Sequence, residues 1–151
     1  MGWGGSGWPG NTGDFALFLN DYAEVGTLRD GGSIAWTWTG LTPGAYRVFS
    51  YAVNAGGFLT DVPVFVPGST SQNPQIVTGP MPGNAFEYLV THAIHDVFAG
   101  GGMLEVIVEQ PPGLDNNFHV NGFQIVSVPE PGTMTILVFG AFLLLARRRR
   151  R

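Results

Sequence analysis

The sequence predicts an all-β fold, a β-sandwich or jelly roll, followed by a single C-terminal transmembrane helix. Three observations lead to this prediction. Several segments alternate apolar and polar residues with a period of two, as half-buried strands do. Glycine–glycine and proline–glycine pairs, drawn from 23 glycines and 11 prolines, separate these segments as turns would. The chain ends in a continuous apolar run followed by an arginine cluster.

The strands of the body follow from side-chain alternation. Trp36 and Trp38 share the apolar face of one segment, so we expect both rings in the core. A segment that is apolar on both faces predicts a central strand covered on each side. The longest segment places Phe86, Tyr88, Val90, Ile94 and Phe98 on one face and is long enough to bend or split. The segments are 33–39 and 104–109, which alternate, 45–53, which is apolar on both faces, and 86–98, the longest.

Two short stretches resemble parts of known β domains. Residues 40–46 (GLTPGAY) resemble the loop-to-strand corner of immunoglobulin-like and fibronectin-like sandwiches, with a spacing one residue tighter. In those folds the tyrosine hydroxyl bonds back to the corner. Residues 120–125 (VNGFQI) resemble the closing strand of jelly-roll carbohydrate-binding modules. The apolar set changes parity across Gly122, which predicts a bulge there.

Charge is divided sharply along the chain. Of 11 acidic residues only Glu130 lies beyond residue 128, whereas the body holds just two basic residues, Arg29 and Arg47, and no lysine. An acidic body repels phosphates, so we expect no nucleic-acid partner. The absence of cysteine excludes disulfides, thiol nucleophiles and thiolate metal sites.

Few residues of the body suggest a ligand site. Asp115, Asn117 and Asn121 are oxygen donors around a turn that could meet sugar hydroxyls or Ca²⁺, although Asx residues also favour turns for their own backbone bonds. His92 and His95 are three apart, so on a strand they face opposite sides and cannot share an ion. We therefore expect no metal and no cofactor.

The C-terminal segment has three parts in order. Residues 129–131 are Pro129, Glu130 and Pro131, residues 133–146 are apolar on every helical face, and Arg147, Arg148, Arg149, Arg150 and Arg151 end the chain. The apolar run spans about 21 Å as a helix, and arginine side chains can snorkel to the headgroups of a locally thinned bilayer. The proline-flanked triplet predicts an extended segment open to an enzyme. We therefore expect a membrane helix at 133–146.

These three parts resemble the PEP-CTERM sorting signal of Gram-negative bacteria. The resemblance covers residues 128–151 and implies processing near the triplet by a membrane-embedded exosortase, in proteins linked to exopolysaccharide production. Basic flanks stay cytoplasmic, so the arginine cluster is expected inside and the body outside the cytoplasm. The final destination would be the cell surface or extracellular matrix. Because export needs a signal peptide that MGWGGSGWPG lacks, we expect the body, residues 1–127, to be N-terminally truncated.

No catalytic constellation emerges from the body. Its acids are scattered, and no G-x-S-x-G signature is present. The sequence therefore favours a non-catalytic envelope or matrix protein associated with exopolysaccharide. The alternative is a carbohydrate-binding module, with or without a requirement for Ca²⁺.

Overall fold

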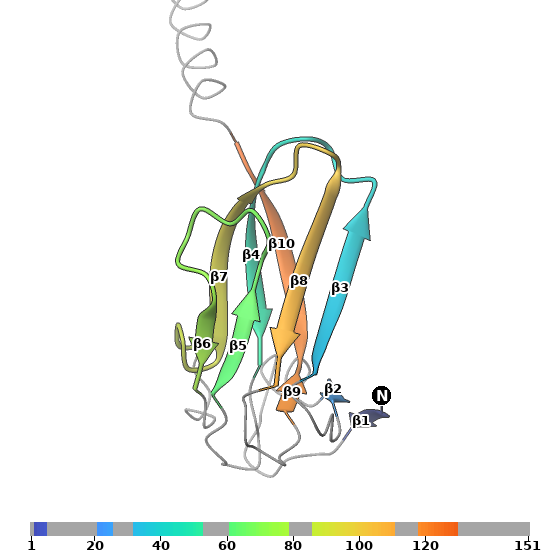
Figure 1. Cartoon of the computed structure of the whole chain (residues 1–151), viewed down its shortest axis with the longest axis vertical. Coiled ribbons are helices and arrows are strands. Elements are labelled where there is room, and N and C mark those ends of the chain that lie inside the picture. The colour runs from blue at the N-terminus through green and yellow to red at the C-terminus, as the bar shows by residue number, and fades with distance from the viewer. Residues whose placement is uncertain are drawn as a thin grey trace, which may run out of the picture.

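The computed structural model describes residues 2–5, 21–25, 32–52, 61–78, 86–110 and 118–129 (Figure 1). This part of the chain is all-β, which confirms the predicted class. Its strands are β1 (Gly2–Gly5), β2 (Asp21–Val25), β3 (Ser33–Thr39), β4 (Ala45–Tyr51), β5 (Val62–Phe65), β6 (Gln75–Val77), β7 (His92–Phe98), β8 (Met103–Glu109), β9 (Phe118–Val120) and β10 (Gly122–Val128).

The strands form three antiparallel sheets. One sheet has the order β10-β4-β7, a second has the order β3-β8-β5-β6, and a small third sheet has the order β1-β2-β9. The two larger sheets pack face to face, because both contribute to one buried cluster (Figure 1). This is a two-layer sandwich.

Valine dominates the space between the two larger sheets. The inner side chains of β5 and β8 are almost fully buried, and β4 and β7 supply the opposite wall. Trp36 and Trp38 are half-buried against this core, and their ring centroids lie 5.0 and 5.2 Å from that of Phe123 on the other sheet. The prediction that both tryptophans pack in the core is confirmed.

The alternation predicted for β3 and β8 holds residue by residue in their burial. β4 is the central strand of its sheet, as predicted, with Tyr46, Val48 and Ser50 buried on its inner face. Its outer face is less covered than the sequence indicates, because Phe49 and Tyr51 are only half-buried and Arg47 is exposed.

The long segment 86–98 divides as the sequence allowed. Only His92–Phe98 is a strand, and residues 86–91 form a turn in which Leu89 has a positive φ of 62°. Ile94 and Phe98 do share the outer face of β7. The inner face consists of Ala93, His95 and Val97, an apolar set interrupted by histidine. His92 lies on the outer face, so the two histidines point to opposite sides as predicted.

The corner at residues 40–46 adopts the hydrogen bond that its resemblance implied. The Tyr46 hydroxyl donates to the carbonyl oxygen of Thr42 at 2.6 Å. Ala99 donates its N–H to the Gly44 carbonyl, and Leu41 donates to the Gly102 carbonyl. The turns 40–44 and 99–102 are therefore tied together where both cross between the sheets.

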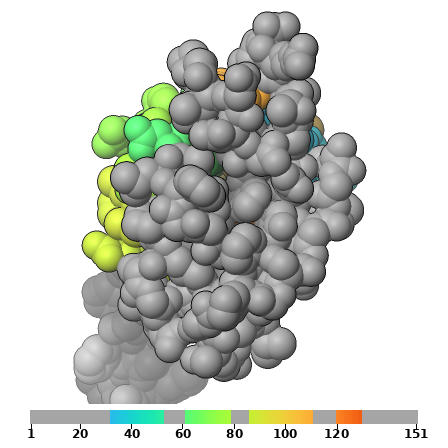
Figure 2. All heavy atoms as spheres, turned by 90° about the horizontal axis from the view of Figure 1, so that it is seen from below, coloured from blue at the N-terminus to red at the C-terminus, as the bar shows by residue number. Residues whose placement is uncertain are grey.

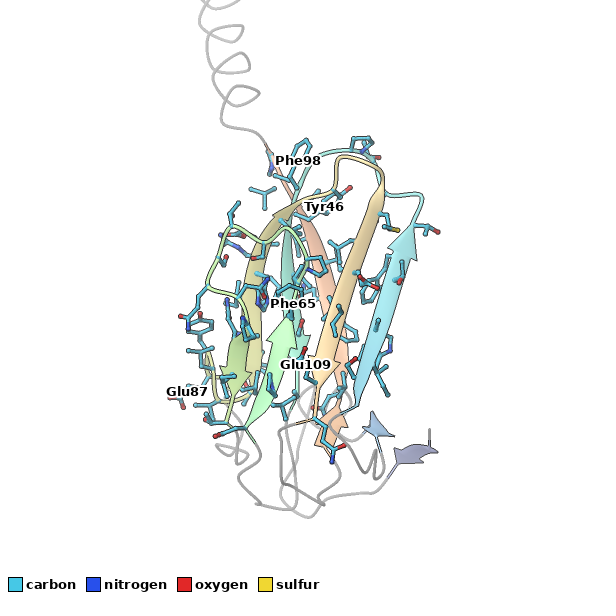
Figure 3. All side chains as sticks on the ribbon, viewed as in Figure 1. Tyr46, Phe65, Glu87, Phe98 and Glu109 are labelled. Carbon is cyan, nitrogen blue, oxygen red and sulfur yellow. The ribbon has the colours of Figure 1, made fainter. Side chains whose placement is uncertain are left out.

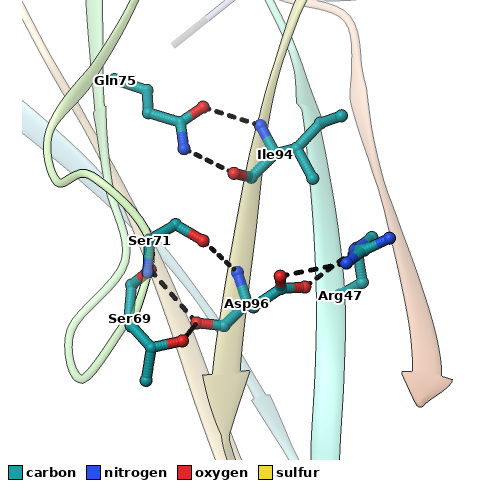
Figure 4. A network of polar contacts seen from close by, with 7 residues as sticks. Arg47, Ser69, Ser71, Gln75, Ile94 and Asp96 are labelled. Atoms are coloured by element: carbon teal, nitrogen blue, oxygen red, sulfur yellow. Dashed lines mark hydrogen bonds and ion pairs between the residues drawn. The ribbon is translucent and has the colours of Figure 1, made fainter.

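The outer edge of β7 is covered by the chain that links β5 to β6 and by Gln75, the first residue of β6 (Figure 4). The Gln75 amide accepts from the Ile94 N–H and donates to the Ile94 carbonyl, as a strand neighbour would. The Ser71 hydroxyl accepts from the Asp96 N–H at 3.0 Å, and Ser69 donates to the Asp96 carbonyl. The Thr70 N–H also donates to the Asp96 carbonyl, so the backbone groups of Ile94 and Asp96 on this edge are occupied and do not remain open to another chain.

The chain changes sheet between Val120 and Gly122. Val120 is buried in β9, whereas Phe123 and Ile125 of β10 point inward, so the predicted change of parity at Gly122 is confirmed. The predicted bulge is replaced by a break in the chain's strand pairing: β9 and β10, on either side of Asn121, belong to different sheets. At Asn121, which joins them, the backbone N–H donates to the Tyr51 carbonyl at 2.9 Å.

The register of the strands defines two ends of the sandwich. We call the end holding Ala45, Phe98, Met103 and Val128 the tail pole, because β10 ends there. We call the other end, where Tyr51 pairs with His92, the loop pole. The connections 53–60, 79–85 and 111–117 all join strand ends at the loop pole. Figure 3 shows Phe98 at one end and Glu87 and Glu109 toward the other.

Candidate functional site

A group of rings lies at the loop pole on the outer face of the β10-β4-β7 sheet. The ring of His92 lies between the others, with centroid distances of 5.2 Å to Tyr51, 6.0 Å to Phe49 and 6.3 Å to Tyr88. Phe86 packs edge-on against Tyr51 at 5.4 Å. We call these five residues the aromatic cluster.

Strand pairing and one turn bring these rings together. Tyr51 is directly opposite His92 in the β4–β7 register, which places both side chains on the same face. The turn before β7 is held by Thr91, whose hydroxyl lies 2.9 Å from the N–H of Glu87 and 3.0 Å from Nδ1 of His92. Fixing the turn in this way positions the rings that precede the strand.

The cluster offers exposed rings beside neutral polar groups. Phe86 is 50% exposed and Tyr88 is 48% exposed, whereas His92 is buried. Burial lowers the pKa of His92 and raises the pKa of Tyr51, so both are uncharged at neutral pH. Flat apolar rings with hydroxyl and imidazole groups at their margin can stack on a ring-shaped ligand and hydrogen-bond to its edge.

β5, β6 and the turn before β7 lie around the loop pole. Figure 2 views the molecule from below, and the green and yellow atoms at one side of it belong to the segments around β5–β6 and the turn before β7. Of the candidate ligand residues, Asp115 and Asn117 fall outside the described ranges. Asn121 is described and half-buried, next to Tyr51 through its backbone hydrogen bond.

The aromatic cluster was not among the site residues that the sequence predicted. The alternation did place Phe86 and Tyr88 on one face, but it gave no sign that Tyr51, from which β5 and β6 separate them in the sequence, would meet them. Within the described residues, no group of three or more histidine and acidic side chains is close enough to hold a metal ion.

A second feature lies at the tail pole. The turn before β4 and the end of β10 enclose an open hollow of about 640 Å³, lined by Thr42, Pro43, Gly44, Ala45, Tyr46, Ile125, Ser127, Val128 and Pro129. Val128, which the sequence pattern grouped with the tail, is the last residue of β10 and pairs with Ala45. The triplet at 129–131 therefore begins directly at the folded body.

Residues 127–151 match the PEP-CTERM protein-sorting motif, as the sequence led us to expect. The motif implies an exported protein with a membrane-anchored C-terminal sorting signal that is recognised by an exosortase. Neither a curated protein nor a solved structure matches the chain. In the ranges that the structure describes, no helix has the length and hydrophobicity of a membrane span. The predicted helix at 133–146 and the arginines at 147–151 are not among those ranges.

Proposed function

We propose that this chain is a non-catalytic protein of the cell envelope, whose β body is delivered outside the cytoplasm and associates with exopolysaccharide. The observation that carries the proposal is the sorting motif at residues 127–151, which begins within the last two residues of β10. In this proposal an exosortase processes the chain near Pro129, Glu130 and Pro131. The apolar helix at 133–146 spans the membrane, with the arginine cluster on the cytoplasmic side.

The sorting part is tested by localisation in a host that has an exosortase. Replacing Glu130 with alanine, or deleting Arg147 to Arg151, is expected to leave the protein mislocalised and unprocessed. Glu109→Ala serves as the control, because Glu109 is an exposed glutamate of the body far from the tail. Normal surface delivery of both tail variants would contradict the sorting role.

The aromatic cluster favours a second candidate, a carbohydrate-binding module on the cell surface. Two of its rings, those of Phe86 and Tyr88, are about half exposed, and burial lowers the pKa of His92 between them. The connection that contains Asp115 and Asn117 joins strands at the same pole. Sugars stack on such rings through their C–H faces and hydrogen-bond through their hydroxyls. Because the body is acidic, it would repel anionic polymers, and these would not occupy the cluster in place of a sugar.

Glycan-array binding separates the two candidates. A reproducible sugar signal that falls on Tyr88→Ala and on Asn121→Ala, but not on Phe98→Ala, would favour the binding module. Phe98 is the matched control, because it is an exposed ring on the same sheet at the opposite pole. Loss of the signal with a chelator would add a Ca²⁺ requirement. Absence of any signal would leave a structural matrix role.

The non-catalytic part of the proposal also has a test. Among the described residues, the histidine with the most perturbed pKa is His95, which is sealed in the core where no substrate can reach it. We expect the body to show no turnover of polysaccharides. Sustained release of reducing ends by the purified protein would overturn this expectation.

A further inference from the structure

Large exposed apolar side chains gather at the tail pole. Phe98 is 61% exposed, Met103 is 58% exposed and Val128 is 38% exposed. Val128 and Phe98 flank Ala45 on adjacent strands, and Met103 follows the short turn 99–102. We call Phe98, Met103 and Val128 the apolar rim. Phe98 and Met103 are thus more than half exposed, and Val128 is exposed over more than a third of its surface.

Charge is distributed unevenly between the two poles. Among the described residues, the charged side chains nearest the apolar rim are Asp96, two residues before Phe98, and Glu105, two residues after Met103. The third is Arg47, which pairs with Val126, two residues before Val128. Arg47 and Asp96 neutralise each other in an ion pair with two hydrogen bonds, from Nε to Oδ1 at 2.8 Å and from Nη2 to Oδ2 at 3.0 Å. The other described carboxylates of known exposure, Asp61, Glu87 and Glu109, lie toward the loop pole. Within the described ranges, which end one residue before Glu130, the tail pole therefore presents little negative charge to an anionic surface.

The sequence after β10 leaves little distance between the tail pole and the predicted membrane helix. From Val128 to Thr133 the chain advances five residues, which span at most about 17 Å when fully extended. The headgroup layer on one side of a bilayer takes up roughly 6 Å of this reach. The tail pole, with its exposed apolar side chains, must consequently stay within about 11 Å of the headgroups.

We propose that the apolar rim lies on the lipid bilayer and holds the sorting triplet at the level of the headgroups. This rests on the proposed function, in which the tail spans the membrane. Moving exposed Phe, Met and Val side chains from water to the membrane interface lowers the free energy. Among the described residues, the few carboxylates near the rim leave little repulsion from anionic lipids. The triplet then sits where a membrane-embedded protease can reach it.

The occupant is a bilayer because the chain itself connects this pole to the membrane. The hollow beside the rim is lined by Pro129, so the same surface also surrounds the start of the triplet. The opposite pole carries the aromatic cluster and the longer connections, and it faces away from the membrane in this arrangement. A soluble protein partner for the rim is the competing outcome of the test.

The chain contains no cysteine, so single-cysteine labelling is straightforward. An environment-sensitive fluorophore is attached at Thr42→Cys, beside the hollow at the tail pole, or at Glu109→Cys, exposed at the loop pole. The full chain is reconstituted in phosphatidylcholine–phosphatidylglycerol vesicles that contain lipids with spin-labelled headgroups. We expect quenching at position 42 to exceed quenching at position 109 several-fold.

A lengthened linker distinguishes docking from simple tethering. With ten Gly/Ser residues inserted after Gly132, docking by the rim keeps the quenching at position 42, whereas simple tethering loses it. In this lengthened chain, Phe98→Ser with Met103→Ser is expected to reduce the quenching several-fold. Tyr88→Ser, which removes a comparably exposed ring from the loop pole, should leave it unchanged.

The outcomes separate the two proposals. Equal quenching at positions 42 and 109, or loss of quenching at 42 on lengthening the linker, overturns docking while leaving the sorting role intact. Failure of the chain to remain with vesicles after alkaline carbonate extraction overturns membrane insertion and docking together. If a soluble protein bound the rim in place of lipid, the fluorophore at position 42 would be shielded from water even without vesicles. This result would also overturn docking.

Discussion

His95 should make the stability of this protein fall steeply as the pH drops from neutral. Its side chain is fully buried between the sheets, and neither ring nitrogen has a hydrogen-bond partner among the described residues. Burial lowers the pKa of His95 from 6.5 to about 4, against a smaller opposing effect of the Asp96 carboxylate. The native state therefore keeps this imidazole neutral where the unfolded chain protonates it.

The sign and size of the effect follow from proton linkage. Between the folded and unfolded pKa values the unfolded state binds more protons, so the free energy of unfolding is highest above pH 6.5 and falls as the pH decreases toward 4. At about 1.4 kcal/mol per pKa unit, the full loss is about 3 kcal/mol, of which about 2.5 kcal/mol is gone by pH 4.5. Typical total stabilities are about 5–15 kcal/mol, so the change is large.

The assay is urea denaturation of the full chain in non-ionic detergent, followed by the fluorescence of the tryptophans packed against Phe123. His95→Leu should keep or increase stability at pH 7, because a buried polar group without partners is replaced by an apolar one. It should also flatten the pH dependence between pH 7 and 4.5. Asp96 does not interfere in this range, because its pKa is lowered, chiefly by the hydrogen bond from Arg47.

Two results would refute this reasoning. A wild-type loss below about 1 kcal/mol across that range would mean that His95 is not effectively desolvated. A His95→Leu variant that kept the full slope would assign the effect to other groups, with His92 the first to consider, because burial lowers its pKa as well.

Three further predictions concern the sandwich itself, each measured by the same denaturation at pH 7. Tyr46→Phe removes the hydroxyl that bonds to the corner and should cost about 1 kcal/mol, with no loss if the bond does not contribute. Gln75→Leu leaves two β7 backbone groups without partners, so we expect a cost of about 2 kcal/mol and aggregation seen by light scattering, and a monomeric variant would argue against edge protection. Gly102→Ala should cost at least about 2 kcal/mol, because its φ is +67° and a Cβ would lie 2.8 Å from the Leu41 oxygen. Gly101→Ala, with open space around it, is the control, and equal effects of the two would contradict the strain.

Sequence alternation predicted the parts of the fold in which each strand faces one core. Trp36, Trp38 and the inner valines of β8 follow the period of two, and burial of one sheet face is enough to produce that period. The change of parity at Gly122 was visible for the same reason. The break between β9 and β10 that causes this change could not be predicted, because the period of two does not show which sheet a strand joins.

The aromatic cluster could not be predicted in the same way. Tyr51 and His92 are cross-strand neighbours, and their pairing depends on the register of β4 against β7. The polar cover of the β7 edge was equally hidden. Gln75 reads as an ordinary polar strand residue, and only the fold places its amide beside the backbone of Ile94. Contacts between distant segments carry no local signature in one sequence.

The direction of β10 separates the two candidate surfaces of this protein. The strand starts beside Tyr51 at the loop pole and ends at Val128, so the chain must leave the sandwich at the opposite end from the aromatic cluster. Its seven residues span about 23 Å, which exceeds the headgroup layer of a bilayer several-fold. A membrane held against the tail pole would therefore not obstruct the cluster. Each antiparallel strand carries the chain from one pole to the other. With one strand more or one strand fewer, the chain would therefore have ended at the loop pole, with the sorting triplet beside the rings. If the cluster binds the proposed ligand, the orientation of the final strand would thus allow sorting and ligand contact to proceed at the same time.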